Sequence, residues 1–567
     1  MKEEYWNYPD FHNVKELIYY VVNRYPNNNA FILKKKIKEA VEYKNISYKE
    51  FLEDLNNFGQ GLFDMGYANK RIGIIGKNRY EWVLIYFSAL LGNMEIVPLD
   101  KGLQEQETEL CIVRGKIDIL FYDDSVEDMI NSIREGGHVN LDEYITMCDV
   151  ENKTSVYSIK ENGKISRQNG NETYEKIKID NDKMSVLCFT SGTSAASKIV
   201  MLSHRNIAFD MSSTHAMEDF RNTDVNLAFL PYHHALGSTS IPFILSYGAA
   251  TAFPDGLRYI QSNLKEYGVT VFIGVPLLIE SMYKKIMKEV SKQKKEKLIN
   301  FMRKATKPCP FMKRIVFKKV ISQLGGKLRL MISGAASIDQ GVCKFFDEIG
   351  IKVIPGYGLT ECSPVAIAES PLCHNYGSIG EPIRGVQAKI VDKNEQGIGE
   401  IAIKGDNVML GYYENEEATR EVFRDGWLLT GDLAYMDAKG RFYITGRKKN
   451  VIITKNGKNI YPEEIEFLIN KIPEVNECMV YAIPKDDDMT LAVKVQYDME
   501  YLKIKYPNLN FKEIDKVIWE KIKEINKGFP TYKYVKHMIA TEEAFIKTTT
   551  AKIKRYEEIE KINNEKK

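Results

Sequence analysis

The chain has 567 residues, several times the usual domain size of roughly 100 to 200 residues, and this length predicts several domains. Hydrophobic residues make up 44% and charged residues 28%, which is typical of a soluble globular protein and excludes a disordered or collagen-like chain. The 79 basic residues nearly balance the 77 acidic ones, and a net charge of +2 does not indicate a nucleic-acid-binding protein.

The N-terminal residues are acidic where a secretion signal would be basic, and no apolar core segment follows them. The eight cysteines show no C-x-x-C pair and no zinc-ligand spacing. This pattern predicts reduced thiols and no structural metal. We therefore expect a cytoplasmic protein.

In the N-terminal half, apolar strand-like runs alternate with amphipathic helical stretches, which indicates parallel α/β layers. A strand is expected at 71–77, a helix at 81–93 and a second strand at 95–100. The same alternation predicts later strands at 269–276, 327–335 and 351–358.

The segment from Leu227 to Pro254 contains no charged residue and is longer than the ~20 residues of a membrane-spanning helix. Pro231, Pro242, two glycines and a His-His pair interrupt it. Such breaks predict two buried elements joined by a turn.

Residues 284–319 carry 14 Lys or Arg against two Glu. We interpret this segment as a solvated helical hairpin. The alternative is a face that approaches anionic lipid at the membrane periphery, or a phosphorylated carrier, because clustered basic residues gain affinity near negative charge.

After Glu400 the sequence changes to short strands and glycine turns, which predicts β-rich structure. From Lys449 onward a strand, a helix and a basic C-terminus are enough for a small α+β domain. We expect the boundary between the two domains at 447/448, which gives domains 1–447 and 448–567.

Three segments carry residue types suited to a nucleotide. The strand 186–189 leads into small and hydroxyl residues that end at Lys198, a pattern that offers N–H groups and positive charge to phosphates. In IPGYGLTECSPV, Tyr357 could stack on a base and Glu361 could hold magnesium. Asp432 suits two ribose hydroxyls, and Arg447 suits phosphate or ribose oxygens.

Together these segments resemble the acyl-adenylate-forming enzymes, and most closely the long-chain fatty acyl-CoA synthetases. FTSGTSAASK resembles the family's phosphate loop, GYGLTE its adenine and magnesium motif, and GD at 431–432 its ribose motif. GRKKN resembles its hinge, and KTTTAKIKR its lysine motif. The resemblance covers about residues 14 to 556.

The resemblance implies an α/β fold. A large N-terminal domain of two doubly wound sheets and a β-barrel-like part would be followed by a small mobile α+β lid. It also implies ATP, Mg²⁺ and coenzyme A as cofactors, and a fatty acid as substrate.

The resemblance assigns roles to individual residues. Lys552, Thr360 and His234 would be catalytic, Lys449 would be the hinge, Gly457 would line the pantetheine route, and Glu361 would bind the metal. The nucleotide would be bound by Thr190, Ser191, Gly192, Thr193, Ser194, Lys198, Gly334, Ala335, Gly356, Tyr357, Gly358, Asp432, Tyr443 and Arg447.

The expected reaction joins a fatty acid to AMP and then to the thiol of coenzyme A. A second hypothesis transfers the acyl group to the phosphopantetheine of an acyl carrier protein. A third is a nucleotide-binding homologue without turnover, because Ala195 and Ser197 depart from the family's phosphate loop.

Overall fold

A computed structural model describes residues 8–37, 40–151, 153–190, 197–215, 217, 219–370, 374–455, 458–485, 488–508, 510–547 and 552–565. The chain forms two compact units. Unit 1 comprises Met1–Lys389, Ala402–Leu428 and Ala438–Phe442, and unit 2 comprises Ile390–Ile401, Leu429–Asp437 and Tyr443–Lys567. The domain boundary expected at 447/448 stays a prediction.

The first large sheet of unit 1 has seven strands. In spatial order they are β18 (Gly411–Tyr412), β8 (Ile199–Ser203), β7 (Met184–Phe189), β4 (Glu95–Leu99), β3 (Arg71–Ile75), β5 (Ile119–Tyr122) and β6 (Glu143–Thr146). The five strands from β7 to β6 run parallel, β8 pairs antiparallel with β7, and β18 pairs antiparallel with β8. The strands expected at 71–77 and 95–100 are confirmed.

The second large sheet has nine strands. In spatial order they are β15 (Glu381–Pro382), β14 (Val365–Ala368), β13 (Lys352–Gly358), β12 (Leu330–Ser333), β11 (Val271–Gly274), β9 (Val225–Leu227), β10 (Ala250–Ala252), β1 (Asn29–Ile37) and β2 (Ala40–Ser47). The strands from β13 to β1 are parallel. Their carboxyl ends therefore meet at one edge, where ligands bind in open α/β sheets.

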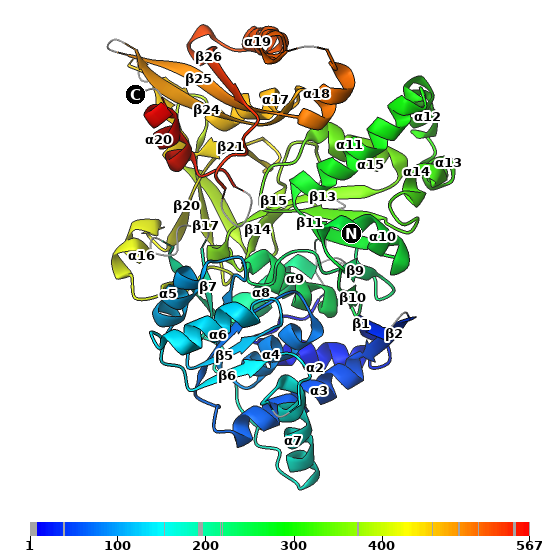
Figure 1. Cartoon of the computed structure of the whole chain (residues 1–567), viewed down its shortest axis with the longest axis vertical. Coiled ribbons are helices and arrows are strands. Elements are labelled where there is room, and N and C mark those ends of the chain that lie inside the picture. Colours follow the sequence, from blue (N-terminus) through cyan, green and yellow to red (C-terminus); the bar gives the residue numbers. More distant parts are fainter. Residues whose placement is uncertain are drawn as a thin grey trace. The chain divides into compact units, whose positions relative to one another are not determined.

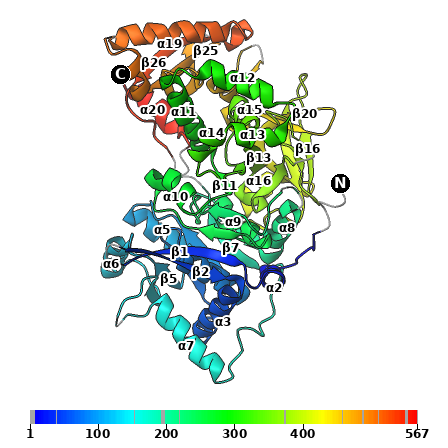
Figure 2. The same ribbon diagram turned by 90° about the vertical axis from the view of Figure 1, so that its right-hand side faces the viewer.

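Helices of unit 1 lie around these sheets (Figures 1 and 2). They are α2 (Val14–Arg24), α3 (Tyr48–Asp64), α4 (Tyr80–Leu91), α5 (Glu105–Gly115), α6 (Glu127–Gly136), α7 (Val156–Gln168), α8 (His204–His215), α9 (Ala235–Ser246), α10 (Ile260–Glu266), α15 (Gln340–Ile349) and α16 (Glu416–Val422). A capping box starts α3, because the Ser47 hydroxyl accepts from the Glu50 N–H at 3.2 Å and the Glu50 carboxylate accepts from the Ser47 N–H at 2.8 Å.

Glycines set the close packing of α3 against α7, which lie side by side in Figures 1 and 2. A Cβ added at Gly163 would lie 1.9 Å from the Asn57 carbonyl oxygen and 2.4 Å from the Gly61 nitrogen. Because both contacts are to backbone atoms, no rotamer change could relieve them.

The uncharged segment 227–254 forms the end of β9, helix α9 and strand β10, so the expected pair of buried elements is confirmed. Pro242 lies inside α9 and does not interrupt it, contrary to our expectation. Every residue of that helix except Leu236 is buried, and this packing outweighs the hydrogen bond that proline removes. Among the described residues, no helix is both long and apolar enough to span a bilayer.

The basic segment 284–319 is helical, as expected. It contains most of α11 (Pro276–Lys292), all of α12 (Glu296–Thr306) and α13 (Pro310–Val316), and the start of α14 (Lys318–Ser322). Five apolar side chains on α12 and α13 are exposed: Leu298, Phe301, Phe311, Met312 and Ile315. A purely solvated hairpin does not account for these five side chains.

The predicted β-rich region after Glu400 is confirmed as part of a five-stranded sheet. Its strands are β16 (Gln387–Val391), β17 (Gly399–Lys404), β20 (Trp427–Met436) and β19 (Phe423–Arg424), with β21 (Phe442–Arg447) beside β20.

The C-terminal part of unit 2 is an α+β layer. Strands β24 (Val475–Lys485), β25 (Asp488–Tyr497) and β26 (Val535–Thr541) form its main sheet, and β22 (Ile452–Ile453) pairs with β23 (Asn459–Ile460). Apolar residues of α17 (Pro462–Ile469) and α19 (Phe511–Asn526) pack with alternate residues of β24 and β25. On the other face of these two strands, Met479, Tyr481 and Ala492 pack with Ile562 of α20 (Arg555–Glu565). Helix α18 (Met499–Lys505) follows β25.

Candidate functional site

The carboxyl edge of the nine-stranded sheet gathers several predicted site residues. Gly334 and Ala335 follow β12, the Gly356–Gly358 run ends β13, and His234 follows β9 immediately before α9. A Cβ at Gly356 would meet no atom within 4 Å, so the backbone there faces open space. This is the edge at which the sheet topology places a ligand.

The phosphate-loop segment connects the antiparallel neighbours β7 and β8. At its ends, the Thr190 N–H donates to the Lys198 carbonyl at 2.9 Å, and the Thr190 hydroxyl accepts from the Lys198 N–H at 3.1 Å. These bonds hold the two ends of the loop together. The predicted phosphate contacts Ser191, Gly192, Thr193 and Ser194 lie outside the described residues.

Arg114, at the end of α5, adds positive charge beside this loop. Its guanidinium donates to the Ser197 carbonyl at 2.6 Å and to the Ser197 hydroxyl at 3.2 Å. A guanidinium at this position holds Ser197 in place and favours an anion nearby.

Tyr412 of β18 connects two predicted groups. The Lys198 ammonium lies 4.5 Å from the centroid of the Tyr412 ring, and the Tyr412 hydroxyl donates to Glu361 Oε1 at 2.8 Å. Burial, followed by the charge of Glu361, raises the pKa of Tyr412, so the phenol stays protonated and remains a donor. The predicted phosphate-loop cation and the predicted magnesium carboxylate therefore both contact the side chain of Tyr412.

The glycine-rich end of β13 turns into the 3₁₀ helix η2 (Thr360–Cys362), which carries Thr360 and Glu361. A Cβ at Gly358 would lie 1.7 Å from the Pro364 carbonyl, so only glycine fits this close approach. The Met409 N–H donates to the Glu361 carbonyl at 2.9 Å and fixes η2 to the segment before β18. Tyr357 is buried, with 7% of its surface exposed.

Asn78 joins the loops that follow β3 and β9. Its amide donates to the carbonyls of Ala228 at 2.8 Å and Leu230 at 2.7 Å, and its oxygen accepts from the Tyr232 N–H at 3.1 Å. The carboxyl edges of the two large sheets are therefore held together beside His234.

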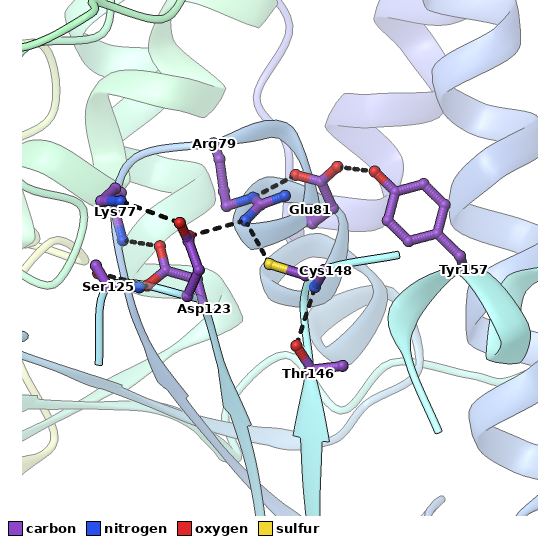
Figure 3. Close-up of polar contacts among 9 residues, drawn as sticks. Lys77, Arg79, Glu81, Asp123, Ser125, Thr146, Cys148 and Tyr157 are labelled. Atoms are coloured by element: carbon purple, nitrogen blue, oxygen red, sulfur yellow. Dashed lines mark hydrogen bonds and ion pairs between the residues drawn. The ribbon is translucent and has the colours of Figure 1, made fainter. Parts of the chain in front are cut away.

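A second polar network lies at the carboxyl ends of β3, β5 and β6 (Figure 3). Arg79 donates to Glu81 at 2.6 Å and lies 3.4 Å from the Cys148 sulfur. The buried Asp123 carboxylate accepts from the backbone N–H groups of Lys77 at 2.7 Å and Ser125 at 2.9 Å. Because its bonds join adjacent loops, we interpret this network as structural.

In unit 2, Asp432, Arg447 and Tyr443 lie on neighbouring strands, and the predicted hinge residue Lys449 follows the second strand. Asp432 of β20 is buried, and its carboxylate lies 2.7 Å from Arg447 Nε at the end of β21. Tyr443 stacks on Tyr435 with ring centroids 4.9 Å apart. Lys449 lies in the exposed 3₁₀ turn η3 (Lys448–Asn450) directly after β21.

Lys552 is exposed, within a loop whose flanks are fixed. Lys547 and Ile553 form a β-bridge across the loop, and the buried Glu558 accepts from the Ile546 N–H and from Lys494 at 2.6 and 2.8 Å. Gly457, predicted at the pantetheine route, lies outside the described residues.

A model of the family described as AMP-binding enzyme matches residues 19–413, more than half of the chain. The chain belongs to the AMP-binding enzyme family. The predicted resemblance to adenylate-forming enzymes is thereby confirmed.

Relatives of this AMP-binding enzyme include long-chain-fatty-acid–CoA ligase 5 of Mus musculus, 29% identical over 91% of this chain and 82% of its own length. Long-chain-fatty-acid–CoA ligase 1 of Homo sapiens is 30% identical over 77% of this chain and 68% of its own length. A long-chain-fatty-acid–[acyl-carrier-protein] ligase of Arabidopsis thaliana is 27% identical over 74% and 68%.

Solved structures support the fold. An anthranilate CoA ligase in complex with anthranoyl-AMP superposes with a TM-score of 0.77 at 19% identity over 97% of both chains. A Mycobacterium tuberculosis fatty acyl CoA synthetase gives 0.65 at 20% identity over 97% of this chain and 98% of its own. The predicted α/β architecture is thereby confirmed.

Sequence reasoning about this AMP-binding enzyme missed Arg114 and Tyr412. Neither residue belongs to a motif. Arg114 lies 83 residues before its partner Ser197, and Tyr412 lies 51 residues after its partner Glu361. The one sequence signal for Tyr412 was its place directly after Gly411, which is too common to single out a site residue.

Proposed function

We propose that this AMP-binding enzyme activates a fatty acid with ATP to acyl-AMP and transfers the acyl group to the thiol of coenzyme A. The observation that carries the proposal is the arrangement of Lys198, Tyr412 and Glu361 at the end of the phosphate loop. The relatives named as long-chain-fatty-acid–CoA ligases support the substrate class.

A carboxylate is a poor electrophile, so joining it to a thiol requires its conversion to a mixed anhydride with AMP. The substrate carboxylate attacks the α-phosphate, forming a C–O–P bond as pyrophosphate leaves. Thr190 to Lys198 and Arg114 hold the outgoing phosphates, and Lys552 bridges carboxylate and phosphate oxygens. Cationic groups aimed at these oxygens stabilise the charge that develops in the transition state.

The residues around Glu361 fit a magnesium ion. The Tyr412 hydroxyl orients the Glu361 carboxylate by donating to Oε1, and this carboxylate would hold the ion. An oxygen ligand of this kind suits Mg²⁺, and the ion would neutralise pyrophosphate when bound. Gly356, Tyr357 and Gly358, with Gly334 and Ala335, would contact the adenosine, and Asp432, Tyr443 and Arg447 its ribose.

In the second half-reaction the C-terminal domain 448–567 turns about Lys449, Lys552 leaves the site, and the pantetheine passes Gly457. The exposed position of Lys449 directly after β21 supports this assignment. The thiol attacks the acyl carbon, and AMP leaves as the thioester forms. His234 borders the acyl carboxylate, with Thr360 beside Glu361.

Carboxylate-dependent exchange of pyrophosphate into ATP tests the proposal with a panel of fatty and amino acids. We expect medium or long saturated fatty acids to drive exchange best, because Tyr232 to Ser240 contains no acidic residue to hold an amino group. Exchange driven best by an amino acid would contradict the substrate class. No exchange with any acid would favour a binding protein without turnover.

An acyl carrier protein is a second candidate acceptor. The 14 basic residues of 284–319 would suit an acidic carrier, and one relative is named as an acyl-carrier-protein ligase. Supplying acyl-AMP with either coenzyme A or holo carrier protein separates the two acceptors. If the thioester forms only on the carrier protein, then the carrier protein is the acceptor and coenzyme A is not.

We further propose that α12 and α13 contact an anionic membrane surface. Phe301 is 69% exposed, Phe311 is 76% exposed and Ile315 is 69% exposed, among the Lys and Arg of the same helices. Apolar side chains that enter the interface, surrounded by cations that meet lipid phosphates, are the features of a peripheral membrane helix. Such a surface would bring the enzyme to fatty acids dissolved in the bilayer.

Sedimentation with vesicles tests this surface. We expect binding to vesicles containing phosphatidylserine, weaker binding to phosphatidylcholine alone, and loss at high salt. Phe301→Ser with Phe311→Ser should weaken binding at least tenfold. Tyr556→Ser, which alters an aromatic residue that is 81% exposed on α20, serves as the matched control. Equal binding by both variants would contradict the assignment.

A further inference from the structure

Three metal-ligating side chains converge between the two large sheets of unit 1, outside the nucleotide motifs. Asp100 follows β4 of the seven-stranded sheet, and His233 and His234 precede α9, in the loop after β9 of the nine-stranded sheet. One ligand atom from each side chain lies within 4.8 Å of the other two.

We propose that Asp100, His233 and His234 bind one divalent transition-metal ion, and that Zn²⁺ matches this donor set best. Two imidazole nitrogens and one carboxylate oxygen are preferred ligands of Zn²⁺, and three protein ligands leave a fourth position open. The site uses none of the cysteines whose spacing argued against a structural zinc.

The distances between the ligand atoms fit one ion. The two Nε2 atoms of His233 and His234 are 3.1 Å apart, and His233 Nε2 is 3.4 Å from Asp100 Oδ2. Ligands of a tetrahedral zinc ion, bound at about 2.0 to 2.2 Å, lie about 3.4 Å from one another. These two separations therefore match the spacing that one ion requires.

The backbone around the cluster is held on both sides. The Gly102 N–H donates to Asp100 Oδ1 at 2.8 Å, and the three bonds of Asn78 hold the loop that leads to the histidines. A Cβ at Gly237 would lie 1.9 Å from the Pro231 carbonyl, so the turn between them is tightly packed. The His233 and Asp100 side chains are largely buried, with 11% and 14% of their surfaces exposed. Such support limits rearrangement on metal binding.

Metal binding would change the protonation of the two histidines. Without metal, the short Nε2 to Nε2 contact needs one ring to donate an N–H to the other. Metal binding requires both Nε2 lone pairs, so the shared proton must leave or move to Nδ1. An ion here takes the lone pair of His234, the residue assigned to the acyl carboxylate, and should inhibit activation. This consequence rests on the proposed function, whereas binding itself does not.

Titration calorimetry of the full chain, purified without a histidine tag and stripped with chelator, tests binding with ZnCl₂ in the absence of ATP and fatty acid. We expect one Zn²⁺ per chain, with affinity reduced at least tenfold in Asp100→Asn and in His233→Gln. His138→Gln, an exposed histidine on another loop, should bind like the parent. Co²⁺ should give the visible absorption of a tetrahedral site in the parent and lose it in His233→Gln.

Unchanged stoichiometry and affinity in both ligand variants would overturn the proposal, as would no binding by the parent. Melting curves without metal separate a lost site from a misfolded variant, and either variant alone suffices if the other fails to fold. Pyrophosphate exchange then separates the two claims. Zinc that inhibits the parent but not His233→Gln supports both, and zinc binding without inhibition supports the site while removing His234 from the acyl pocket.

Discussion

At the proposed magnesium site, Glu361 would supply the charged ligand, and the Tyr412 hydroxyl orients that carboxylate. Glu361→Gln keeps the shape of the side chain but removes its negative charge. We expect adenylation to fall by roughly 10²-fold or more, with a higher Mg²⁺ concentration at half-maximal rate. Rates measured across a Mg²⁺ titration test this expectation.

Tyr412→Phe is the matched variant, because it removes only the hydroxyl that donates to Glu361. The negative charge of Glu361 stays in place in this variant, so its effect on adenylation should be smaller than that of Glu361→Gln. A Glu361→Gln variant with a parental rate and a parental melting curve would mean that Glu361 is an ordinary loop acid.

His215 is a residue whose protonation should affect stability. Its ring stacks between Tyr8 and Tyr247 at 3.4 and 3.8 Å. Burial, aided by Arg24 and Arg384, lowers the pKa of His215 to about 3 from its ordinary value of 6.5. His215 therefore binds a proton near pH 6.5 in the unfolded chain but only near pH 3 in the folded chain. The free energy of unfolding decreases as pH falls from about 6.5 towards 3.

Each pH unit in this window costs about 1.4 kcal/mol for one such histidine. Denaturation between pH 7 and pH 4.5 should show a shallower loss of stability for His215→Phe, which keeps a ring in the stack, than for the parent. His138→Gln controls for an exposed histidine. Parallel pH profiles for His215→Phe and the parent would show that His215 is protonated in the folded state.

At the scale of elements, the contact between α3 and α7 depends on glycine. Gly163→Ala would place a methyl group 1.9 Å from the Asn57 carbonyl oxygen, so the helices must separate. We expect a loss of about 1 to 3 kcal/mol despite the better helix propensity of alanine, seen as a lower midpoint of thermal unfolding.

Asn162→Ala, at the adjacent exposed position of α7, is the matched control and should leave the midpoint unchanged or raise it. If Gly163→Ala melts like Asn162→Ala, the two helices are not packed as closely as described.

Elements with a strong local pattern could be predicted from the sequence. Parallel strands such as β3 and β4 are continuous apolar runs, because both faces of their sheet are covered. Pro242 misled this reasoning, since local preference favours a break whereas burial of α9 favours a continuous helix. Arg114 and Tyr412 could not be predicted from the sequence, because their roles depend on contacts between distant segments.

At the scale of the whole molecule, the proposed rotation uses two residues differently. Lys552 contributes charge only during adenylation, so Lys552→Ala should abolish acyl-AMP formation yet convert supplied acyl-AMP and coenzyme A to thioester at a near-normal rate. Lys449→Pro fixes φ near −65° at the hinge and should keep adenylation while losing thioester formation. Assays of both half-reactions in both variants test this crossed pattern.

Equal loss of both steps in a variant whose melting curve matches the parent would contradict the rotation. Equal loss with a lowered melting temperature would mean that the substitution disrupts folding, and Lys449→Ala then tests the hinge without the constraint of proline.

The Asn78 side chain has a consequence for how unit 1 comes apart. Its three hydrogen bonds run from the loop after β3 of the seven-stranded sheet to the loop after β9 of the nine-stranded sheet, so all three are lost when the two edges separate. Heat capacity scans should therefore record one endotherm for both sheets. In Asn78→Ala, the loss of three hydrogen bonds of about 0.5 to 1.5 kcal/mol each should move that endotherm to a lower temperature.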